Sequence, residues 1–167
     1  MSQPIFDAER VYHPAIAIGR ISFTLPDASS VYPHPVPLSL LLAADEKAYI
    51  ELSNIREMME RALHERFRQS FAISGGTVEP GSIKFRNGEL VITGPALALL
   101  VIIQVISGYP DFREGVKQIV EDSRAVIEQV GSSAGAKDVI FDPADIDQVA
   151  AVIEPTIPQE VRDKIKK

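Results

Sequence analysis

The side chains best suited to proton transfer near neutral pH are three histidines, at positions 13, 34 and 64. His13 and His34 each lie beside a proline, and His64 is followed by a glutamate without the second histidine of an HExxH zinc motif. Cysteine is absent, which excludes a cysteine nucleophile, a CxxC redox pair and a zinc ribbon. The sequence therefore offers no catalytic residue, no metal ligand and no cofactor site among these residue types.

Glycine-rich and acidic segments also lack the spacing that ligand binding requires. Ser74-Gly75-Gly76 and Pro80-Gly81-Ser82 match neither GxxxxGK[ST] nor GxGxxG, the patterns in which glycines bring a phosphate close to the backbone. Four aspartates between positions 138 and 147 lack the central glycine and alternating ligands of an EF-hand. A carboxylate site needs no local motif, so a small enzyme with a site built from scattered acidic residues stays a third alternative.

The charge of the chain disfavours nucleic acid and anionic lipid as general partners. There are 17 Lys and Arg residues against 23 Asp and Glu residues, which gives a net charge of −6. The arginines between positions 56 and 68 are interleaved with glutamates that cancel their local field, so we expect no nucleic-acid binding. Residues 1–10 lack the basic start and apolar stretch of a secretion signal, so we expect a cytoplasmic protein.

Charge is distributed unevenly along the chain. Residues 90–110 carry none, and residues 96–106 read ALALLVIIQVI. Pro95 suits the first turn of a helix, so we predict an apolar helix over 95–108. Its 14 residues would extend about 21 Å, which is shorter than the ~30 Å hydrocarbon core of a bilayer. This length favours burial or contact with a partner over a helix that permanently spans a membrane.

Hydrophobic periodicity predicts the elements that surround this helix. Alternating apolar residues predict a strand over 15–25, with a bulge beside Gly19 where the alternation changes phase. Apolar residues three or four positions apart predict an amphipathic helix over 45–69. Its apolar stripe is formed by Leu52, Ile55, Met59, Leu63 and Phe67. A second amphipathic helix is predicted over 111–130, with Asp111 in the first position of a capping box.

Strands are predicted over 71–92, with a hairpin turn at Asn87-Gly88, because both residues tolerate the positive φ of a type I′ turn. Residues 1–130 are therefore predicted to form a single α+β domain. In it, a small antiparallel sheet with this hairpin packs against amphipathic helices and the very apolar helix. Pro26-Asp27 is expected to end the first strand, and residues 131–167 to form a linker and short C-terminal helices.

An apolar helix must be covered on every side. We therefore predict a non-enzymatic interaction or self-association module whose contact surface is formed by Leu97, Leu100, Val101, Ile103 and Gln104. Its partner would be another protein or further copies of the chain, in a homo-oligomer. The alternative is a membrane-inserting effector that uses residues 90–109 after a conformational change, which would make the cytoplasmic protein membrane-associated.

Three segments follow one another within about residues 45–130: Gly81–Phe85, the apolar run 96–106, and Tyr109–Val116. Together with the order strand, helix, hairpin, apolar helix and amphipathic helix, this pattern resembles small prokaryotic modules that occur alone or as effector-associated domains of signalling and defence proteins. The pattern contains no catalytic motif. The resemblance implies a non-enzymatic signalling or defence adaptor, or a membrane-directed effector.

Overall fold

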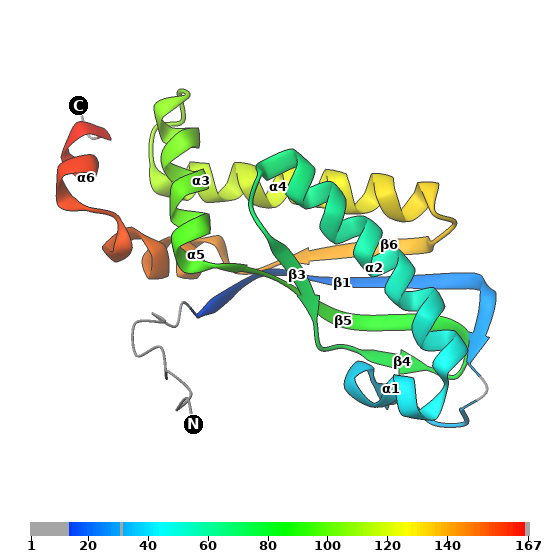
Figure 1. The fold of residues 1–167 in the computed structure, drawn as a ribbon. Helices are drawn as coiled ribbons and strands as arrows, with labels where there is room; N and C mark the ends of the chain where they lie inside the picture. Colours follow the sequence, from blue (N-terminus) through cyan, green and yellow to red (C-terminus); the bar gives the residue numbers. More distant parts are fainter. Residues whose placement is uncertain (1–13, 31, 166–167) are drawn as a thin grey trace, which may run out of the picture.

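The computed structural model describes residues 14–30 and 32–165 and has the α+β fold that the sequence predicts (Figure 1). His13 lies outside the described residues. The strands are β1 (Ala15–Ser30), β2 (Val36–Pro37), β3 (Phe71–Ser74), β4 (Thr77–Glu79), β5 (Gly81–Thr93) and β6 (Lys137–Pro143). The helices are α1 (Leu38–Ala44), α2 (Glu46–Phe67), α3 (Gly94–Ile106), α4 (Phe112–Ser133), α5 (Ile146–Ile153) and α6 (Gln159–Ile165), with a 3-10 turn, η1, at Glu154–Thr156.

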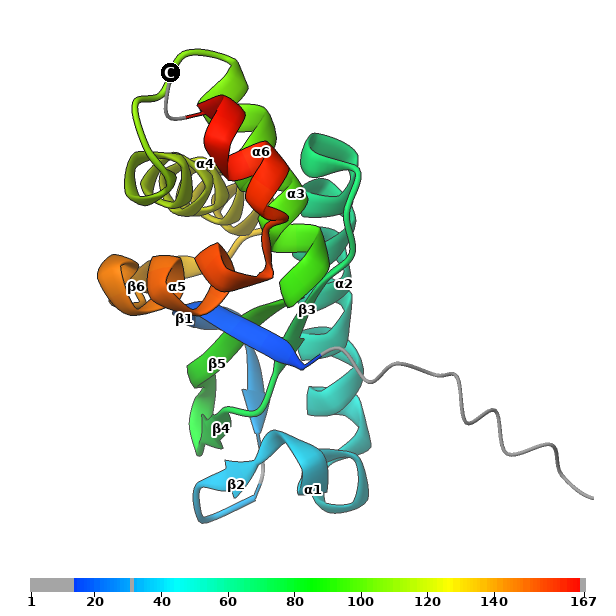
Figure 2. The ribbon, with the colours of Figure 1, turned by 90° about the vertical axis from the view of Figure 1, so that its left-hand side faces the viewer.

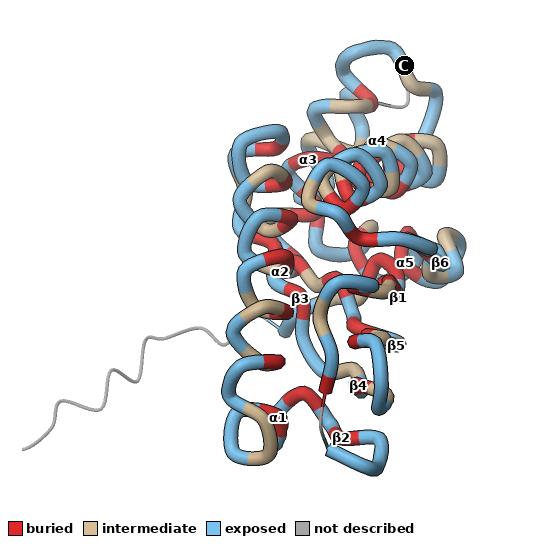
Figure 3. The backbone as a smooth tube through the Cα atoms, turned by 90° about the vertical axis from the view of Figure 1, so that its right-hand side faces the viewer, coloured by how far each residue is buried: buried red, intermediate tan, exposed pale blue. Residues whose placement is uncertain are grey.

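The strands form one antiparallel sheet in the order β2-β4-β5-β1-β6, and β3 also pairs with β5. Helices α2 and α4 cover one face of this sheet (Figure 2). In α2, the buried residues lie on the side that faces the sheet (Figure 3). Along β1, Ile21 and Phe23 are fully buried, whereas Arg20 is exposed and Ser22 and Thr24 are half-buried. This alternation is typical of an antiparallel sheet with one face packed on the core and the other facing solvent.

Strand β1 is longer and more irregular than predicted. The predicted bulge beside Gly19 is confirmed, because the pairing with β5 shifts register between Ala17 and Gly19. The prediction that Pro26-Asp27 ends the strand is wrong, since pairing with β5 resumes at Ser29 and Ser30 after a further register shift. A proline is tolerated here because the irregular segment needs no ladder hydrogen bond at that position.

The predicted hairpin at Asn87-Gly88 is also wrong. Strand β5 runs without interruption through both residues, and Gly88 pairs with Ile21 of β1. Asn87 does adopt a positive φ of 56°, but it lies in a β-bulge between the Phe85–Phe23 pair and the Gly88–Ile21 pair, where β5 has one extra residue. A positive φ therefore bends β5 at this point and does not reverse the chain.

The chain reverses instead at Pro80-Gly81, between β4 and β5, where Gly81 has a φ of 87°. Strands β3 and β4 pair with β5 in a single register across Gly75-Gly76, with Ser74 opposite Glu89 and Thr77 opposite Arg86. They are therefore two parts of one interrupted strand. Their pairing occupies the side of β5 away from β1, which allows both neighbours to pair along the full length of β5.

Both predicted amphipathic helices are confirmed, and so are their start positions. The Asp45 side chain accepts a hydrogen bond from Ala48 N at 3.1 Å, and the Asp111 side chain accepts one from Glu114 N at 2.9 Å. All five residues of the predicted apolar stripe in α2 are buried. Helix α1 precedes α2 and is separated from it by Asp45 alone.

Strand β6 lies within 131–167, where only a linker and short helices were predicted. It pairs with β1 at one edge of the sheet. Of its residues only Phe141 is buried, so the period-2 signal was too weak to find it. The Phe141 ring lies against Gly19, where an added Cβ would be 2.3 Å from Phe141 Cζ. The glycine at the β1 bulge thus makes room for the aromatic ring of β6.

Candidate functional site

Helix α3 is fixed to the sheet at its N-terminal end. It follows β5 without a connecting loop, and Thr93 occupies its N-cap position. Gly94 N donates to Pro14 O at 3.3 Å, immediately before β1 begins. The predicted role of Pro95 in the first turn is confirmed. The direction in which the helix leaves the sheet is therefore set by two neighbouring strands.

The loop after α3 is held by a chain of polar contacts. Tyr109 OH donates to Gln118 Oε1 of α4 at 2.7 Å, and Gln118 Nε2 donates to Asp122 Oδ1 at 2.7 Å. Arg66 Nη2 of α2 donates to the other carboxylate oxygen of Asp122 at 3.1 Å. These contacts connect the C-terminal end of α3 to both long helices.

Close packing of α3 on α4 fixes the rotation of α3 about its axis. Gly115 of α4 is buried, and an added Cβ there would lie 3.2 Å from Val101 Cγ1. The sequence suggests that Gly115 is only a weak point in a helix, since glycine costs about 1 kcal/mol relative to alanine. In the structure it permits the approach of the two helices.

The fixed rotation divides α3 into a buried face and an exposed face. The buried residues are Gly94, Leu97, Ala98, Leu100, Val101 and Val105. On the other side, the exposed fractions are 47% for Leu99, 49% for Ile103 and 73% for Ile106. Ile102 lies beside them and is half-buried. We call Leu99, Ile102, Ile103 and Ile106 the α3 outer face, because their spacing of three and four residues places them along one side of the helix.

The structure brings only one of the five predicted contact residues onto this outer face. Leu97, Leu100 and Val101 point into the core, with exposed fractions of 0, 7 and 0%. Ile103 is half exposed, and Gln104 is half-buried, with its Cβ 3.5 Å from the Cβ that an alanine at Gly115 would have. The residues that accompany Ile103 on the outer face, Leu99 and Ile106, were not predicted.

The sequence contained part of the missing information. Steps of four residues back and three forward from Ile103 lead to Leu99 and Ile106, as one face of a helix requires. Gln104 is the one polar residue of α3, and because it is half-buried it does not mark the side that faces solvent. The packing of α3 against its neighbours decides this, including the contact of Val101 with Gly115 of α4.

Residues 90–93 of the segment considered for membrane insertion belong to β5, and α3 has 13 residues. At 1.5 Å per residue the helix extends about 20 Å. Across the described part of the chain, none of the helices combines the length and apolar character needed to cross a bilayer.

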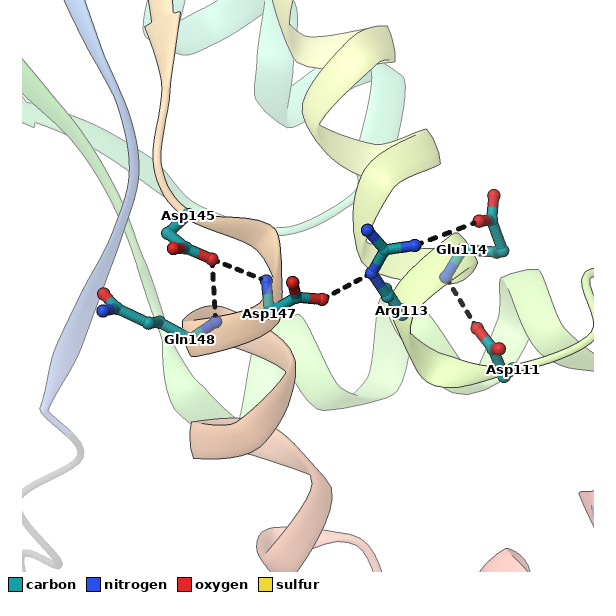
Figure 4. A network of polar contacts seen from close by, with 6 residues as sticks. All are labelled: Asp111, Arg113, Glu114, Asp145, Asp147 and Gln148. Atoms are coloured by element: carbon teal, nitrogen blue, oxygen red, sulfur yellow. Dashed lines mark hydrogen bonds and ion pairs between the residues drawn. The ribbon is translucent and has the colours of Figure 1, made fainter.

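A polar network lies next to α3, where α4 and α5 begin (Figure 4). Arg113 Nε donates to Asp147 Oδ1, and Arg113 Nη1 lies 3.8 Å from Glu114 Oε1. The hydrogen bond to Asp147 raises the pKa of the Arg113 guanidinium. Asp145 and Asp111 accept backbone hydrogen bonds in the first turns of α5 and α4. The network therefore caps two helices and connects them, and it is exposed to solvent.

The histidines and the acidic cluster do not form a common site. His34 is exposed with its ring centroid 6.3 Å from that of Tyr32, and exposed His64 has Nδ1 3.3 Å from Gln69 O. Asp145 is a helix cap and Asp147 contacts Arg113. Within residues 14–30 and 32–165, no three His, Asp or Glu side chains are arranged to hold a metal ion.

Comparison of the chain with protein-family models, with curated proteins and with solved structures found no match.

Proposed function

We propose that this chain is a protein-interaction module that self-associates through the α3 outer face. One observation carries the proposal: three large aliphatic side chains, Leu99, Ile103 and Ile106, are 47 to 73% exposed along one side of a single helix. Exposed apolar residues that occur singly need no explanation, whereas a row of them indicates a contact surface.

The composition of this segment suits an interface. No charged residue occurs between positions 90 and 110, so association through the α3 outer face leaves no charge of this segment buried without a partner. Depletion of charge is a property of interface centres. Burial of aliphatic surface contributes about 25 cal/mol per Å².

The size of the surface predicts a weak and reversible association. One helix of about 20 Å presents less than the roughly 800 Å² per partner of a standard stable interface. We expect two copies related by a two-fold axis, with the same four residues contributed by each copy. A dimer of this kind would be populated at high protein concentration and dissociate on dilution.

Self-association requires no rearrangement of the fold, in contrast to membrane insertion. Insertion of residues 90–109 into a bilayer would withdraw Leu97 and Val101 from the core, and Leu90 and Ile92 from β5, although these four side chains are at most 1% exposed. The α3 outer face uses side chains that are already accessible. For this reason we favour a protein contact.

The proposal is tested by sedimentation velocity over a range of protein concentrations. We expect the wild-type chain to shift from monomer to dimer and the Ile103→Arg variant to stay monomeric. Ile140→Arg is the matched control, because Ile140 of β6 is exposed to a similar extent, 54% against 49%, but lies on another part of the surface. The proposal is wrong if the wild type is monomeric at all concentrations, or if the two variants behave alike.

A further inference from the structure

A hollow of about 570 Å³ lies away from α3, between α1, α2 and the turn from β3 to β4. Leu38 N donates to Gly76 O at 2.9 Å and thereby connects the start of α1 to this turn. Leu42, which is 52% exposed, and half-buried Tyr49 give the hollow an apolar wall. Arg56 of α2 contributes the one cation among the described residues that line it.

The guanidinium of Arg56 has few partners in the protein. Its Nη2 donates to Ile73 O at 3.0 Å, and its Nε is buried without a hydrogen-bond partner. Arg56 forms no ion pair with any residue in the described ranges. A guanidinium has five N–H donors in a planar arrangement that matches a carboxylate. Half-buried Arg56 therefore retains donor capacity at the wall of the hollow.

Glu60, one turn along α2, is an acidic residue whose charge interacts with that of Arg56. Its carboxylate accepts a hydrogen bond from the backbone of Ile73, and burial raises its pKa in spite of the attraction of Arg56. The carboxylate of Glu60 thus interacts with the backbone of β3. It does not form an ion pair that would neutralise Arg56. It should nevertheless repel an anion bound at Arg56.

We propose that this hollow binds a monovalent carboxylate attached to an aliphatic body, with Arg56 contacting the carboxylate and Leu42 and Tyr49 contacting the aliphatic part. A guanidinium can bind a carboxylate or a phosphate in a bidentate manner, but a single guanidinium compensates only the single charge of a carboxylate. A phosphate dianion would need further cations, and none lines the hollow among the described residues. An aliphatic amino acid with a blocked amine and the C-terminus of a peptide both present this chemistry.

The test is a titration of the full chain with N-acetyl-leucine, followed by amide chemical shifts. N-acetyl-leucinamide is the matched neutral probe. We expect the carboxylate to shift the signals of Ser39, Ser74 and Gly75 and to bind at least about tenfold more tightly than the amide, as expected for a charge-assisted hydrogen-bond pair. A tetrapeptide that ends in leucine distinguishes the two sources, since tighter binding of the peptide indicates a peptide C-terminus and equal binding indicates a small carboxylate.

Two substitutions on α2 should act in opposite directions. Arg56→Gln should weaken binding of N-acetyl-leucine at least about tenfold, and Glu60→Gln should strengthen it by removing the nearby negative charge. Glutamine at position 60 has the shape of glutamate and can still accept from Ile73 N, whereas glutamine at position 56 is shorter than arginine and loses the hydrogen bond to Ile73 O. Thermal unfolding of both variants confirms that they fold.

A third variant avoids the buried residues altogether. Leu42→Glu places a carboxylate at the exposed wall and should abolish binding, whereas Leu42→Gln, the uncharged control, removes only the aliphatic contact and should weaken binding less. The proposal is overturned if N-acetyl-leucine does not bind at roughly 10 mM. It is overturned equally if the leucinamide binds as tightly, or if Arg56→Gln and Leu42→Glu leave the affinity unchanged.

Discussion

At the scale of single residues, the ring of Phe85 shows how glycine is used in this fold. Its ring lies against the backbone at Gly76 and Gly88, where an added Cβ would be 2.6 and 2.4 Å from the nearest ring carbons. The ring also contacts that of Phe23, at a centroid distance of 5.3 Å. The aromatic ring therefore fills a space that only backbone without a Cβ leaves open.

We predict that Gly76→Ala destabilises the chain more than Gly75→Ala. Both glycines have positive φ, 89° and 67°, so both substitutions introduce backbone strain of about 1–2 kcal/mol. Only Gly76 would also meet the Phe85 ring, which adds about 1–3 kcal/mol of overpacking, whereas nothing lies within 4 Å of a Cβ at Gly75. Urea denaturation measures the difference, and equal losses in the two variants would contradict this packing.

Glu60 makes the stability of the fold depend on pH. Burial raises its pKa in the folded chain above the unfolded value of about 4.5, so the folded state binds the proton more readily. The free energy of unfolding should consequently fall as the pH rises from about 4.5 through the folded pKa. Across this window, the wild type should lose stability relative to the Glu60→Gln variant.

Urea denaturation of both proteins at a series of pH values between 4 and 8 gives this difference. Glu65→Gln, an exposed glutamate on the same helix, controls for the general effect of removing one negative charge. If the difference between the wild type and Glu60→Gln stays constant or grows in the opposite direction, burial does not dominate at Glu60.

At the scale of elements, the orientation of α3 determines which of its apolar side chains are available to a partner. We predict that Leu97→Ala costs about 2–5 kcal/mol of unfolding free energy, because this fully buried side chain would leave a cavity. Leu99→Ala, two residues along the same helix, should cost less than about 1 kcal/mol, because Leu99 is 47% exposed. The two variants differ only in the face of α3 that they alter, so similar losses would mean that the helix is rotated from its described position.

The elements with strong local periodicity were predictable from sequence, and those that depend on distant pairing were not. The amphipathic stripe of α2, the caps Asp45 and Asp111 and the start of α3 at Pro95 all follow from nearby residues. Asn87-Gly88 has the residues of a hairpin, but pairing of β5 with β1 on one side and with β3 and β4 on the other converts the site into a bulge. The local sequence favours a positive φ at Asn87, but it does not determine whether the chain reverses there.

For the candidate site, the helix was predictable from the sequence but its exposed face was not. The apolar run identified the helix, and Ile103 was among the residues expected to form a contact. The assignment of Leu97 and Val101 to the core depends on how α3 packs against other elements, as Val101 does against Gly115 of α4. Burial is a property of helix packing, and a helix with apolar residues on all sides does not reveal it.

At the scale of the whole molecule, the exposed surfaces differ in how strongly they disfavour contact with another chain. The solvent-facing side of the sheet is mostly polar, with Arg20, Glu89 and Asp142 opposite one another on three neighbouring strands. The edge of β3 contacts Arg56 and Glu60 of α2, which bind the backbone of Ile73 and so hinder addition of another strand. The α3 outer face carries no charged residue and is not covered by another element of the described chain, which supports the proposal that it contacts a further copy.

Cross-linking through a single cysteine tests this role most directly, because the chain contains no cysteine of its own. The Ile103→Cys variant is treated with a short bismaleimide at a concentration where wild type is partly dimeric, and Ile140→Cys is treated in parallel. We predict a covalent dimer for Ile103→Cys that is lost on adding Ile106→Arg to the same chain, and little dimer for Ile140→Cys. Equal yields from the two cysteines, or a yield that Ile106→Arg does not reduce, would contradict self-association through the α3 outer face.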